Sequence, residues 1–594
     1  MTTIEKLAAV RALMRQRGVD MLLVPSDDHH QSEYVAPHFK ARAWLSGFTG
    51  SAGTLILTAD TAKLFTDGRY YIQAARQIEG SGIDLMKSGS EGVPTPEEYI
   101  AANLKGGQTL AYDGRCVSCK LADDIAKKLP ESVKIVSDVD FPGLIWNDRP
   151  GLPGTKLWAL DVKYAGKSHA EKLSDVRAAL AEKKCTAFVM SSLNDIAWFY
   201  NLRGNDVSTT QTFLSYCIVT ETSDTLYADR SAAADVAEQL KTNGVTLRDY
   251  GVFYADLAEI KGETVLIDKS AVNAAIVNLL SGCKTVDAKN PTLLMKAKKN
   301  EIELENLRRC HIADGLAVTK LMLELKYGER EFDELSVAEY LKNLRRECAE
   351  RVGVHFIDVS FGTIAAFGAN AAMMHYSASK DSNAKIDRTA PVPMLLVDSG
   401  GQYLEGTTDI TRTFVLGGIS DEIRKHYTLT AMGMLRLARA QFLEGATGIA
   451  LDVLCRQPLW EAGIDYRCGT GHGVGYCLSV HEGPNRFHWK NGSAKLEVGM
   501  ITTDEPGVYE ENSHGIRIEN ELVTQKSVHN EYGQFLCFEN LTFCPIDLDG
   551  IDTAYMDRSD IRRLNDYHAQ VREVLSPYLC PGDREKLAYL TREV

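Results

Sequence analysis

The amino-terminal part of the sequence contains the same helix-to-strand pattern twice, at an offset of 166 residues. Thr2-x-x-Glu5 and Ser168-x-x-Glu171 each have the form of a capping box, which satisfies free amide groups at the start of a helix. Each predicted helix leads to an apolar strand, at 19–25 and 185–191, and then to strands at 53–57 and 213–219. The repeat predicts two similar α/β units in tandem. The alternative is two unrelated helix–strand pairs, which are common.

Two segments rich in proline and glycine mark the expected domain boundaries, at 149–154 and 287–291. Beyond them, a long helix is predicted from an Asn300-x-x-Glu303 capping box to about Tyr327, where Gly328 ends it. Further helical patterns lie near 335–350, 421–443 and 449–462, between strand segments rich in Gly, Asp, Glu and His. We therefore expect three domains, at residues 1–154, 155–290 and 291–594.

The charge balance is acidic, with 66 Lys and Arg residues against 80 Asp and Glu residues, a formal net charge of −14. Because phosphate contacts need a basic face, we expect no nucleic-acid partner. An acidic protein suits metal cations or cationic peptides. The sequence has no run of 18 apolar residues, and no apolar signal segment follows Met1. We expect no membrane partner and a cytoplasmic location.

The cysteines and two adjacent histidines are residue types that can bind metal ions. The 13 cysteines are scattered, so we expect reduced thiols. Cys116-Val-Ser-Cys119 lacks the second close pair that a zinc site of that type needs, and we interpret the pair as incidental. His29 and His30 are neighbours, and adjacent side chains on a strand point in opposite directions. We interpret these two histidines as structural or substrate-lining residues, not as metal ligands.

Two aspartates follow apolar strand patterns in the third domain. Asp398 ends the run Leu395-Leu-Val-Asp, and Asp409 lies in Thr407-Thr-Asp-Ile-Thr-Arg-Thr413. On a strand, Asp409, Thr411 and Thr413 share one face. Two carboxylates on adjacent antiparallel strands would repel each other unless a cation lay between them. Each aspartate could instead be a turn residue or a helix cap, and both interpretations remain open.

A glycine-rich segment carries the first of two histidines. His472 lies in Gly469-Thr-Gly-His-Gly-Val-Gly475, and His481 follows nine residues later. Glycine at alternate positions lets the backbone approach a neighbour closely. The segment is no phosphate loop, because it lacks the Lys-Ser/Thr ending. A single histidine is more often structural, but two within ten residues favour a function.

Two glutamates complete the set of candidate metal ligands. Glu505 precedes a Pro-Gly turn, and Glu519 ends Gly515-Ile-Arg-Ile-Glu, where Arg517 shares its strand face. By default such an Arg and Glu form a surface ion pair. Four carboxylates and one imidazole suit a pair of divalent metal ions, such as Mn²⁺ or Co²⁺, or Zn²⁺. The candidate metal ligands are Asp398, Asp409, His472, Glu505 and Glu519.

These five segments resemble the pita-bread metallopeptidases, and the whole chain resembles the three-domain, cytosolic-type aminopeptidase P family. The likeness includes Pro25-Ser-Asp-Asp-His-His-Gln-Ser-Glu-Tyr34, Leu45-Ser-Gly-Phe-Thr-Gly-Ser-Ala-Gly53, Phe65-Thr-Asp-Gly-Arg-Tyr70 and Ile196-Ala-Trp-Phe-Tyr-Asn-Leu-Arg-Gly204. The resemblance implies two tandem creatinase-like α/β domains followed by a pita-bread metallopeptidase domain. It also implies hydrolysis of the N-terminal Xaa-Pro bond of peptides by a hydroxide that bridges two metal ions, with Mn²⁺ expected, and a homodimer.

The resemblance assigns roles to single residues. Asp409 and Glu519 would bridge both ions, Asp398 would complete one ion, and His472 with Glu505 the other. Glu505 matches the proton acceptor of the family, and His375 and His481 match histidines that contact the substrate or the tetrahedral intermediate. The residues expected at the substrate are Arg69, His375, His472, His481, Tyr509 and Arg517, with Arg517 also expected to hold a ligand. Arg69 could instead pair with Asp67 in a turn, and Tyr509 could pack on the core.

Four alternatives were compared with this interpretation. Prolidase shares the five ligands but cleaves dipeptides ending in proline, and its chains usually have two domains. Methionine aminopeptidase consists essentially of the last domain alone. Creatinase-type enzymes lack the metals, and a non-catalytic pita-bread module that binds peptides or proteins typically loses ligands. All five ligands are intact in this sequence, which favours the aminopeptidase.

Overall fold

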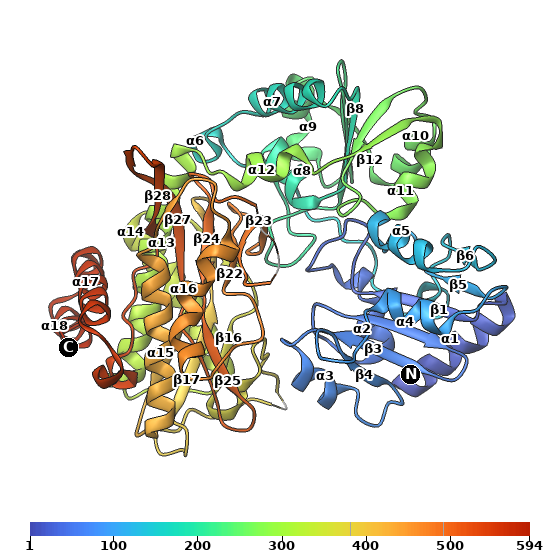
Figure 1. Ribbon diagram of the computed structural model, residues 1–594. Helices are drawn as coiled ribbons and strands as arrows, with labels where there is room; N and C mark the ends of the chain where they lie inside the picture. The colour runs from blue at the N-terminus through green and yellow to red at the C-terminus, as the bar shows by residue number, and fades with distance from the viewer. Residues whose placement is uncertain (381, 491, 493) are drawn as a thin grey trace. The chain divides into compact units, whose positions relative to one another are not determined.

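The computed structural model describes residues 1–594 except 381, 491 and 493, and its chain divides into two compact units (Figure 1). Unit 1 contains Met1–Leu160 and Lys167–Thr292, and unit 2 contains Asp161–Gly166 and Leu293–Val594. Each unit has its own hydrophobic core.

Unit 1 contains two six-stranded sheets with the same topology. In order across the first sheet the strands are β4 (Asp84–Lys87), β3 (Ala62–Thr66), β2 (Thr54–Thr58), β1 (Met21–Pro25), β5 (Thr109–Ala111) and β6 (Lys134–Val136). In the second sheet they are β12 (Thr246–Asp249), β11 (Asp224–Ala228), β10 (Ser215–Thr220), β8 (Ala187–Met190), β13 (Thr264–Ile267) and β14 (Lys284–Asp287). In both, the central strand pairs antiparallel on one side and parallel on the other. A small ladder joins β7 (Trp158–Ala159) to β9 (Leu202–Arg203).

The helices of unit 1 repeat as well. Capping boxes at Thr2 and Ser168 begin the equivalent helices α1 and α7. The helices are α1 (Thr3–Arg17), α2 (Ala41–Ser46), α3 (Tyr71–Gln77), α4 (Pro96–Asn103), α5 (Cys119–Lys128), α7 (His169–Glu182), α8 (Leu193–Tyr200), α9 (Ala237–Thr242), α10 (Phe253–Ala258) and α11 (Ala274–Leu279).

The repeat extends to individual side-chain contacts. Lys6 on α1 donates to the carbonyl of Trp44 at 2.8 Å, and Lys172 on α7 donates to that of Trp198 at the same distance. Both ammonium groups also lie over the ring of that tryptophan, a cation–π arrangement. The prediction of two similar α/β units is therefore confirmed, and chance similarity of two helix–strand pairs is excluded.

Unit 2 combines helices with several small sheets. Its helices are α6 (Val162–Ala165), α13 (Glu301–Tyr327), α14 (Glu334–Val352), α15 (Asp421–Ala438), α16 (Gly448–Glu461), α17 (Arg558–Leu575) and α18 (Pro581–Leu590), and α12 (Pro291–Ala297) spans the unit boundary. Helix α13 packs on α14, and α15 packs on α16 (Figure 1). The long helix predicted from the Asn300 capping box to Gly328 is confirmed. The predicted helix 421–443 is shorter, because residues 441–443 pair with another strand instead.

The strands of unit 2 position the candidate site. The sheets are β15 (Phe356–Val359), β18 (Gly401–Tyr403) and β19 (Gly406–Thr407); β16 (Ile364–Phe367), β17 (Met394–Ser399) and β20 (Ile410–Val415); β21 (Gln441–Leu443), β28 (Gly533–Asn540), β27 (Asn520–Asn530), β24 (Ile501–Asp504), β22 (Gly471–Gly473) and β23 (Glu482–Phe487); and β25 (Gly507–Glu510) with β26 (His514–Arg517). The predicted fold class, two α/β domains followed by a mixed α and β domain, is confirmed.

All 13 cysteines are free thiols. Among the described helices, none combines the length and the apolar character that crossing a bilayer requires.

Candidate metal centre

Three of the five predicted ligands converge in unit 2. Asp409, His472 and Glu519 each offer one ligand atom, and these atoms lie within 4.8 Å of one another. Asp409 immediately precedes β20, His472 lies on β22, and Glu519 lies between β26 and β27. Residues more than 100 positions apart in sequence thus form one cluster, with Asp409 and Glu519 buried and His472 half-buried.

The two aspartates belong to neighbouring antiparallel segments: Asp398 lies on β17, and Asp409 immediately precedes β20. Strand β17 pairs antiparallel with β20, and Asp398 is the register partner of Thr411. Thr411 donates from its hydroxyl to Oε2 of Glu519 at 2.6 Å. The hydroxyl of Thr413 bonds to the backbone of Arg517. The strand face that carries Asp409 therefore also holds the segment that carries Glu519.

His472 is held in a defined tautomer. Its Nδ1 lies 2.9 Å from the carbonyl oxygen of Gly473, and a carbonyl only accepts, so Nδ1 carries the proton. Its Nε2 then offers a lone pair, 3.6 Å from Oδ2 of Asp409 and 3.5 Å from Oε1 of Glu505. A Cβ at Gly471 would overlap the carbonyl oxygen of Thr503, so only glycine allows this close strand contact.

Glu505 follows β24 and joins the cluster through His472. Its amide donates to the carbonyl of Thr470 at 2.7 Å, and its Oε1 accepts from the Thr503 hydroxyl at 3.3 Å. Burial raises the pKa of Glu505 to about 7, while Arg517 lowers it and Asp398 raises it. Glu505 therefore lies within the electrostatic reach of the two residues on the neighbouring strands.

Arg517 links the acids to an aromatic side chain. Its Nη2 donates to Oδ2 of Asp398 at 2.5 Å, and its Nη1 donates to the hydroxyl of Tyr509 at 2.6 Å. Its Nε donates to the hydroxyl of Thr411 at 3.3 Å. Arg517 was expected beside Glu519 on the same strand face, and its carboxylate partner in the structure is Asp398.

The cluster has the properties of a cation site. Within the described part of the chain, Oδ1 of Asp398, Oδ1 of Asp409 and Oε1 of Glu519 are buried without a hydrogen-bond partner. Burial raises the pKa of Asp409 and of Glu519 well above the usual range, and repulsion from the neighbouring carboxylates adds to this. Buried acceptors without donors are costly, and divalent cations would satisfy them. The residues therefore fit a carboxylate-rich metal site.

The structure also identifies supporting residues that the sequence interpretation did not name. Glu521 accepts from the amide of Asp409 through Oε1 at 2.5 Å, and His311 on α13 lies 3.2 Å from the same oxygen. Glu521 follows Glu519 by two residues, which places it next to the ligand strand and is a usable signal. His311 has no such signal, because it comes from a helix 210 residues earlier.

The remaining predicted residues lie in different places. The ring of His481 packs edge-on against His472, with centroids 4.2 Å apart. His375 is half-buried and follows Met374, whose carbonyl accepts from Arg517 at 3.3 Å. Tyr509 bonds to Arg517 as described. Arg69 belongs to unit 1, where it forms a forked pair with Asp67 and lies 3.6 Å from Glu33.

Comparison with protein families covers nearly the whole chain. Residues 6–150 and 148–303 each match a creatinase/prolidase N-terminal domain. Residues 305–526 match metallopeptidase family M24, and residues 534–594 match the C-terminal region of that peptidase. The tandem N-terminal domains and the pita-bread domain are thus found in the expected order.

Full-length relatives agree with this organisation. The chain is 39% identical to a probable Xaa-Pro aminopeptidase P of Neurospora crassa, over 100% of this chain and 89% of that protein. It is 39% identical to a protein of the same name from Leptosphaeria maculans, over 100% of this chain and 98% of that one. A crystal structure of the X-prolyl aminopeptidase of Caenorhabditis elegans, described as a cytosolic enzyme with a di-nuclear active site, matches with a TM-score of 0.93 and 30% identity over 100% of both chains.

Proposed function

The chain belongs to the Xaa-Pro aminopeptidase family of M24 metallopeptidases, and we infer from this membership that it is a metalloaminopeptidase that removes the N-terminal residue from peptides with proline in second position. The observation that carries this inference is the convergence of Asp409, His472 and Glu519 in a chain that matches such enzymes over its full length. The two N-terminal domains of this chain also favour the aminopeptidase over a prolidase.

We propose that five residues hold two divalent metal ions. Asp409 and Glu519 would bridge the ions, Asp398 would complete one, and His472 with Glu505 the other. The support is the close approach of their ligand atoms and the three buried carboxylate oxygens without donors among the described residues. Carboxylate oxygens with one imidazole suit Mn²⁺, and the same donors accept Co²⁺ or Zn²⁺. Mn²⁺ is the metal we propose.

The protein residues then prepare a hydrolytic reaction. Bound ions of this kind act as Lewis acids, which polarise a carbonyl and lower the pKa of a water molecule. Glu505 takes up the proton released from the attacking water at a carboxylate oxygen. Arg517 holds Asp398 in place through its 2.5 Å hydrogen bond. Gly473 keeps the proton of His472 on Nδ1, away from the carboxylates.

We assign the substrate to the side of the cluster where His481 packs on His472. His481 and His375 would donate hydrogen bonds to the developing oxyanion and to the leaving group, as general acids do. Tyr509 and Arg517 would line the same site, since one hydrogen bond joins them. Arg69 remains a predicted substrate contact from the N-terminal domain, although its guanidinium already donates two hydrogen bonds to the carboxylate of Asp67.

The bond to proline explains why such a site is specialised. A prolyl peptide bond is a tertiary amide without an N–H group, and the ring fixes φ. A peptidase that recognises its substrate by that N–H therefore fails at this bond. Histidines that contact the carbonyl and the ring do not need it.

We also propose a cytoplasmic homodimer. Ile449, Val453 and Trp460 share one face of α16 and are 37%, 43% and 39% exposed. An exposed apolar stripe on a helix is typical of an interface, and we propose that a second copy covers it. The location follows the structural relative described as cytosolic, and it agrees with 13 free thiols. Sedimentation of the protein with and without Val453→Glu tests the dimer.

One peptide panel tests the activity. Protein freed of metal by a chelator receives Mn²⁺ and is offered Ala-Pro-Ala, Ala-Pro and Ala-Ala-Ala. We expect release of alanine from Ala-Pro-Ala, and a much weaker reaction or none with the others. Cleavage of Ala-Pro alone would indicate a prolidase, and no cleavage with Mn²⁺, Co²⁺ or Zn²⁺ would indicate a non-catalytic module.

A further inference from the structure

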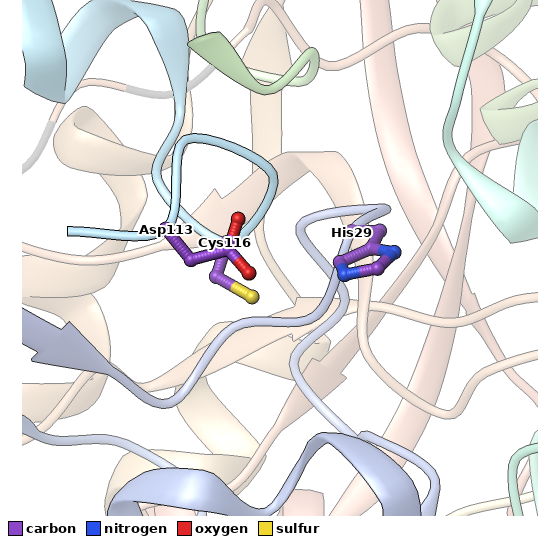
Figure 2. A group of neighbouring side chains, drawn as sticks. All are labelled: His29, Asp113 and Cys116. Atoms are coloured by element: carbon purple, nitrogen blue, oxygen red, sulfur yellow. The ribbon is translucent and has the colours of Figure 1, made fainter. Parts of the chain in front are cut away.

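A second group of potential metal ligands lies in unit 1. His29, Asp113 and Cys116 each offer one ligand atom, and these atoms lie within 4.8 Å of one another (Figure 2). Asp113 and Cys116 form the two ends of one turn, since the Cys116 amide donates to the Asp113 carbonyl at 2.9 Å. His29 comes from the segment after β1. In Figure 2 the thiol, the carboxylate and the imidazole face a common space.

The group contains one residue of each of two close pairs in the sequence: His29 of His29-His30 and Cys116 of Cys116-Val-Ser-Cys119. His30 uses both ring nitrogens, at 2.9 Å from the Ser191 carbonyl and 2.9 Å from the Tyr250 hydroxyl. Cys119 begins α5 and lies outside the group. In the described chain, no hydrogen bond reaches a ring nitrogen of His29 or the thiol of Cys116. His29, unlike His30, therefore has ring nitrogens available to a metal ion, which departs from the interpretation that neither of the two histidines is a metal ligand.

The surroundings favour a cation. Oδ2 of Asp28 is buried without a hydrogen-bond partner among the described residues. Asp27, Asp113 and Asp140 line one small cavity together with Cys116, so several carboxylates lie near this thiol. Arg149 pairs with Asp140 and offsets one of these charges.

The carboxylate of Asp113 is already oriented. Arg115 donates to it from the backbone amide at 2.9 Å, from Nε at 3.1 Å and from Nη2 at 2.9 Å. Oδ1 accepts two of these hydrogen bonds and Oδ2 accepts one, so Oδ2 keeps a further lone pair. Carboxylates that ligate a metal are in turn hydrogen-bonded, so Arg115 serves as the outer partner of Asp113. The positive charge of Arg115 offsets one negative charge of the group and so reduces the attraction for a cation.

A small cavity adjoins the turn. Its volume is about 20 Å³, and its lining includes Asp27, Asp113, Cys116 and Asp140. A cavity of this size holds a single water molecule. A water molecule in this cavity would lie beside Asp113 and Cys116, two of the three candidate ligands.

We propose that His29, Asp113 and Cys116 bind one zinc ion, separate from the two metal ions of the catalytic centre. Imidazole nitrogen, carboxylate oxygen and thiolate sulfur are the three donor types of protein zinc sites, and together they favour Zn²⁺ over harder cations such as Mn²⁺. The two sites therefore differ in the metal they select.

The ion would bind within the first α/β domain of unit 1, since all three ligands belong to it, beside the hydrogen bonds that join this domain to the second. Residues 273–275, next to the second sheet, bond to both segments that carry the ligands. The Asn273 side chain donates to the His29 carbonyl at 2.7 Å. The amides of Ala274 and Ala275 donate to the carbonyls of Val117 and Gly114 at 2.9 and 3.0 Å. Zinc would fasten His29 to the Asp113–Cys116 turn at this junction, and its binding would stabilise the folded state.

Cobalt provides a test that the catalytic centre does not disturb. Co²⁺ bound to a thiolate gives a ligand-to-metal charge-transfer absorption, and the five proposed catalytic ligands contain no sulfur. The full-length protein is titrated with Co²⁺ beside Cys116→Ser, His29→Gln and the matched control Cys119→Ser. We expect the absorption in the wild type and in Cys119→Ser. We expect its loss in Cys116→Ser and a weakened or shifted absorption in His29→Gln.

Zinc content supplies the second readout. After dialysis against Zn²⁺, Cys116→Ser should hold one zinc ion fewer per chain than the wild type, and Cys119→Ser the same number. Circular dichroism of each variant shows whether it is folded. The proposal is overturned if the wild type shows no thiolate absorption with Co²⁺, or if Cys116→Ser keeps both the absorption and the zinc.

Discussion

Arg517 donates a hydrogen bond of 2.5 Å to Oδ2 of Asp398, while Oδ1 of the same carboxylate is buried without a hydrogen-bond partner among the described residues. The same guanidinium donates to the hydroxyl of Tyr509 at 2.6 Å. One oxygen of the aspartate is thus held by the protein, and the other is left for a cation. This division of one carboxylate between an arginine and a metal is the basis of the first prediction.

Arg517→Lys should weaken metal binding. A lysine keeps the charge but cannot donate to Asp398 and Tyr509 in the fixed fork of a guanidinium. We expect the affinity for Mn²⁺ to fall by about 10- to 100-fold, the usual effect of losing such an outer partner. Titration calorimetry measures this. Arg436→Lys is the control, because Arg436 forms a similar fork with Asp560 elsewhere in unit 2. Unchanged Mn²⁺ affinity in Arg517→Lys would mean that Asp398 is not a ligand.

Glu519→Gln should abolish activity. The amide removes one negative charge from a residue proposed to bridge both ions, and so weakens both. We expect turnover of Ala-Pro-Ala to fall by more than about 100-fold, with a lower metal content by mass spectrometry. Glu497→Gln, at an exposed ion pair with Lys298, should behave as the wild type. Near-normal turnover with two metal ions still bound would contradict the bridging role.

His481→Ala and His472→Ala should have different effects. Without His481 we expect kcat to fall by about 100-fold or more while the metal content stays unchanged, as for a lost general acid. Without His472 we expect the metal content itself to fall. Metal analysis and steady-state kinetics on both variants separate the two roles. If His481→Ala loses the metal and His472→Ala keeps it, the two roles are exchanged.

His568 should make the protein sensitive to acid. Burial, with Arg412 and Arg572 nearby, lowers the pKa of His568 from 6.5 to about 3, and its Nε2 accepts from the Ile546 amide at 3.1 Å. Between these pH values the unfolded chain binds the proton and the folded chain does not, so stability falls as the pH drops below 6.5. At pH 5 this amounts to about 2 kcal/mol.

The matching variant is His568→Gln, whose amide oxygen still accepts from Ile546. Urea unfolding at pH 7.5 and at pH 5 should show a smaller loss of stability at pH 5 in the variant than in the wild type. His529→Gln, at an exposed position, is the control. Equal losses in the wild type and in His568→Gln would show that His568 does not cause the acid sensitivity.

Local sequence signals predicted the elements well. The capping box at Asn300 and the stop at Gly328 define α13 as expected, and the two equivalent capping boxes at Thr2 and Ser168 begin the repeated helices. These signals act over three or four residues, so the sequence contains all of their information. The end of α15 was missed because a partner strand almost 100 residues away sets it.

Contacts between distant segments were harder to predict. His514 follows the turn residues Asn512 and Ser513 in the sequence, yet it is 1% exposed, and its Nε2 lies 3.0 Å from Nδ1 of His426 on α15. His311 and Glu521 support Asp409 from two other elements, and no local pattern joins them. In the same way, no spacing in the sequence brings His29 to Cys116. Such pairs depend on the packing of whole elements, not on their own neighbours.

The most direct test of the central claim is a crystal structure of the Mn²⁺-loaded protein, with diffraction data collected at the manganese absorption edge. We predict two anomalous peaks among Asp398, Asp409, His472, Glu505 and Glu519, with Asp409 and Glu519 contacting both. A single peak there, or manganese bound only by other residues, would contradict the dinuclear centre proposed for this chain.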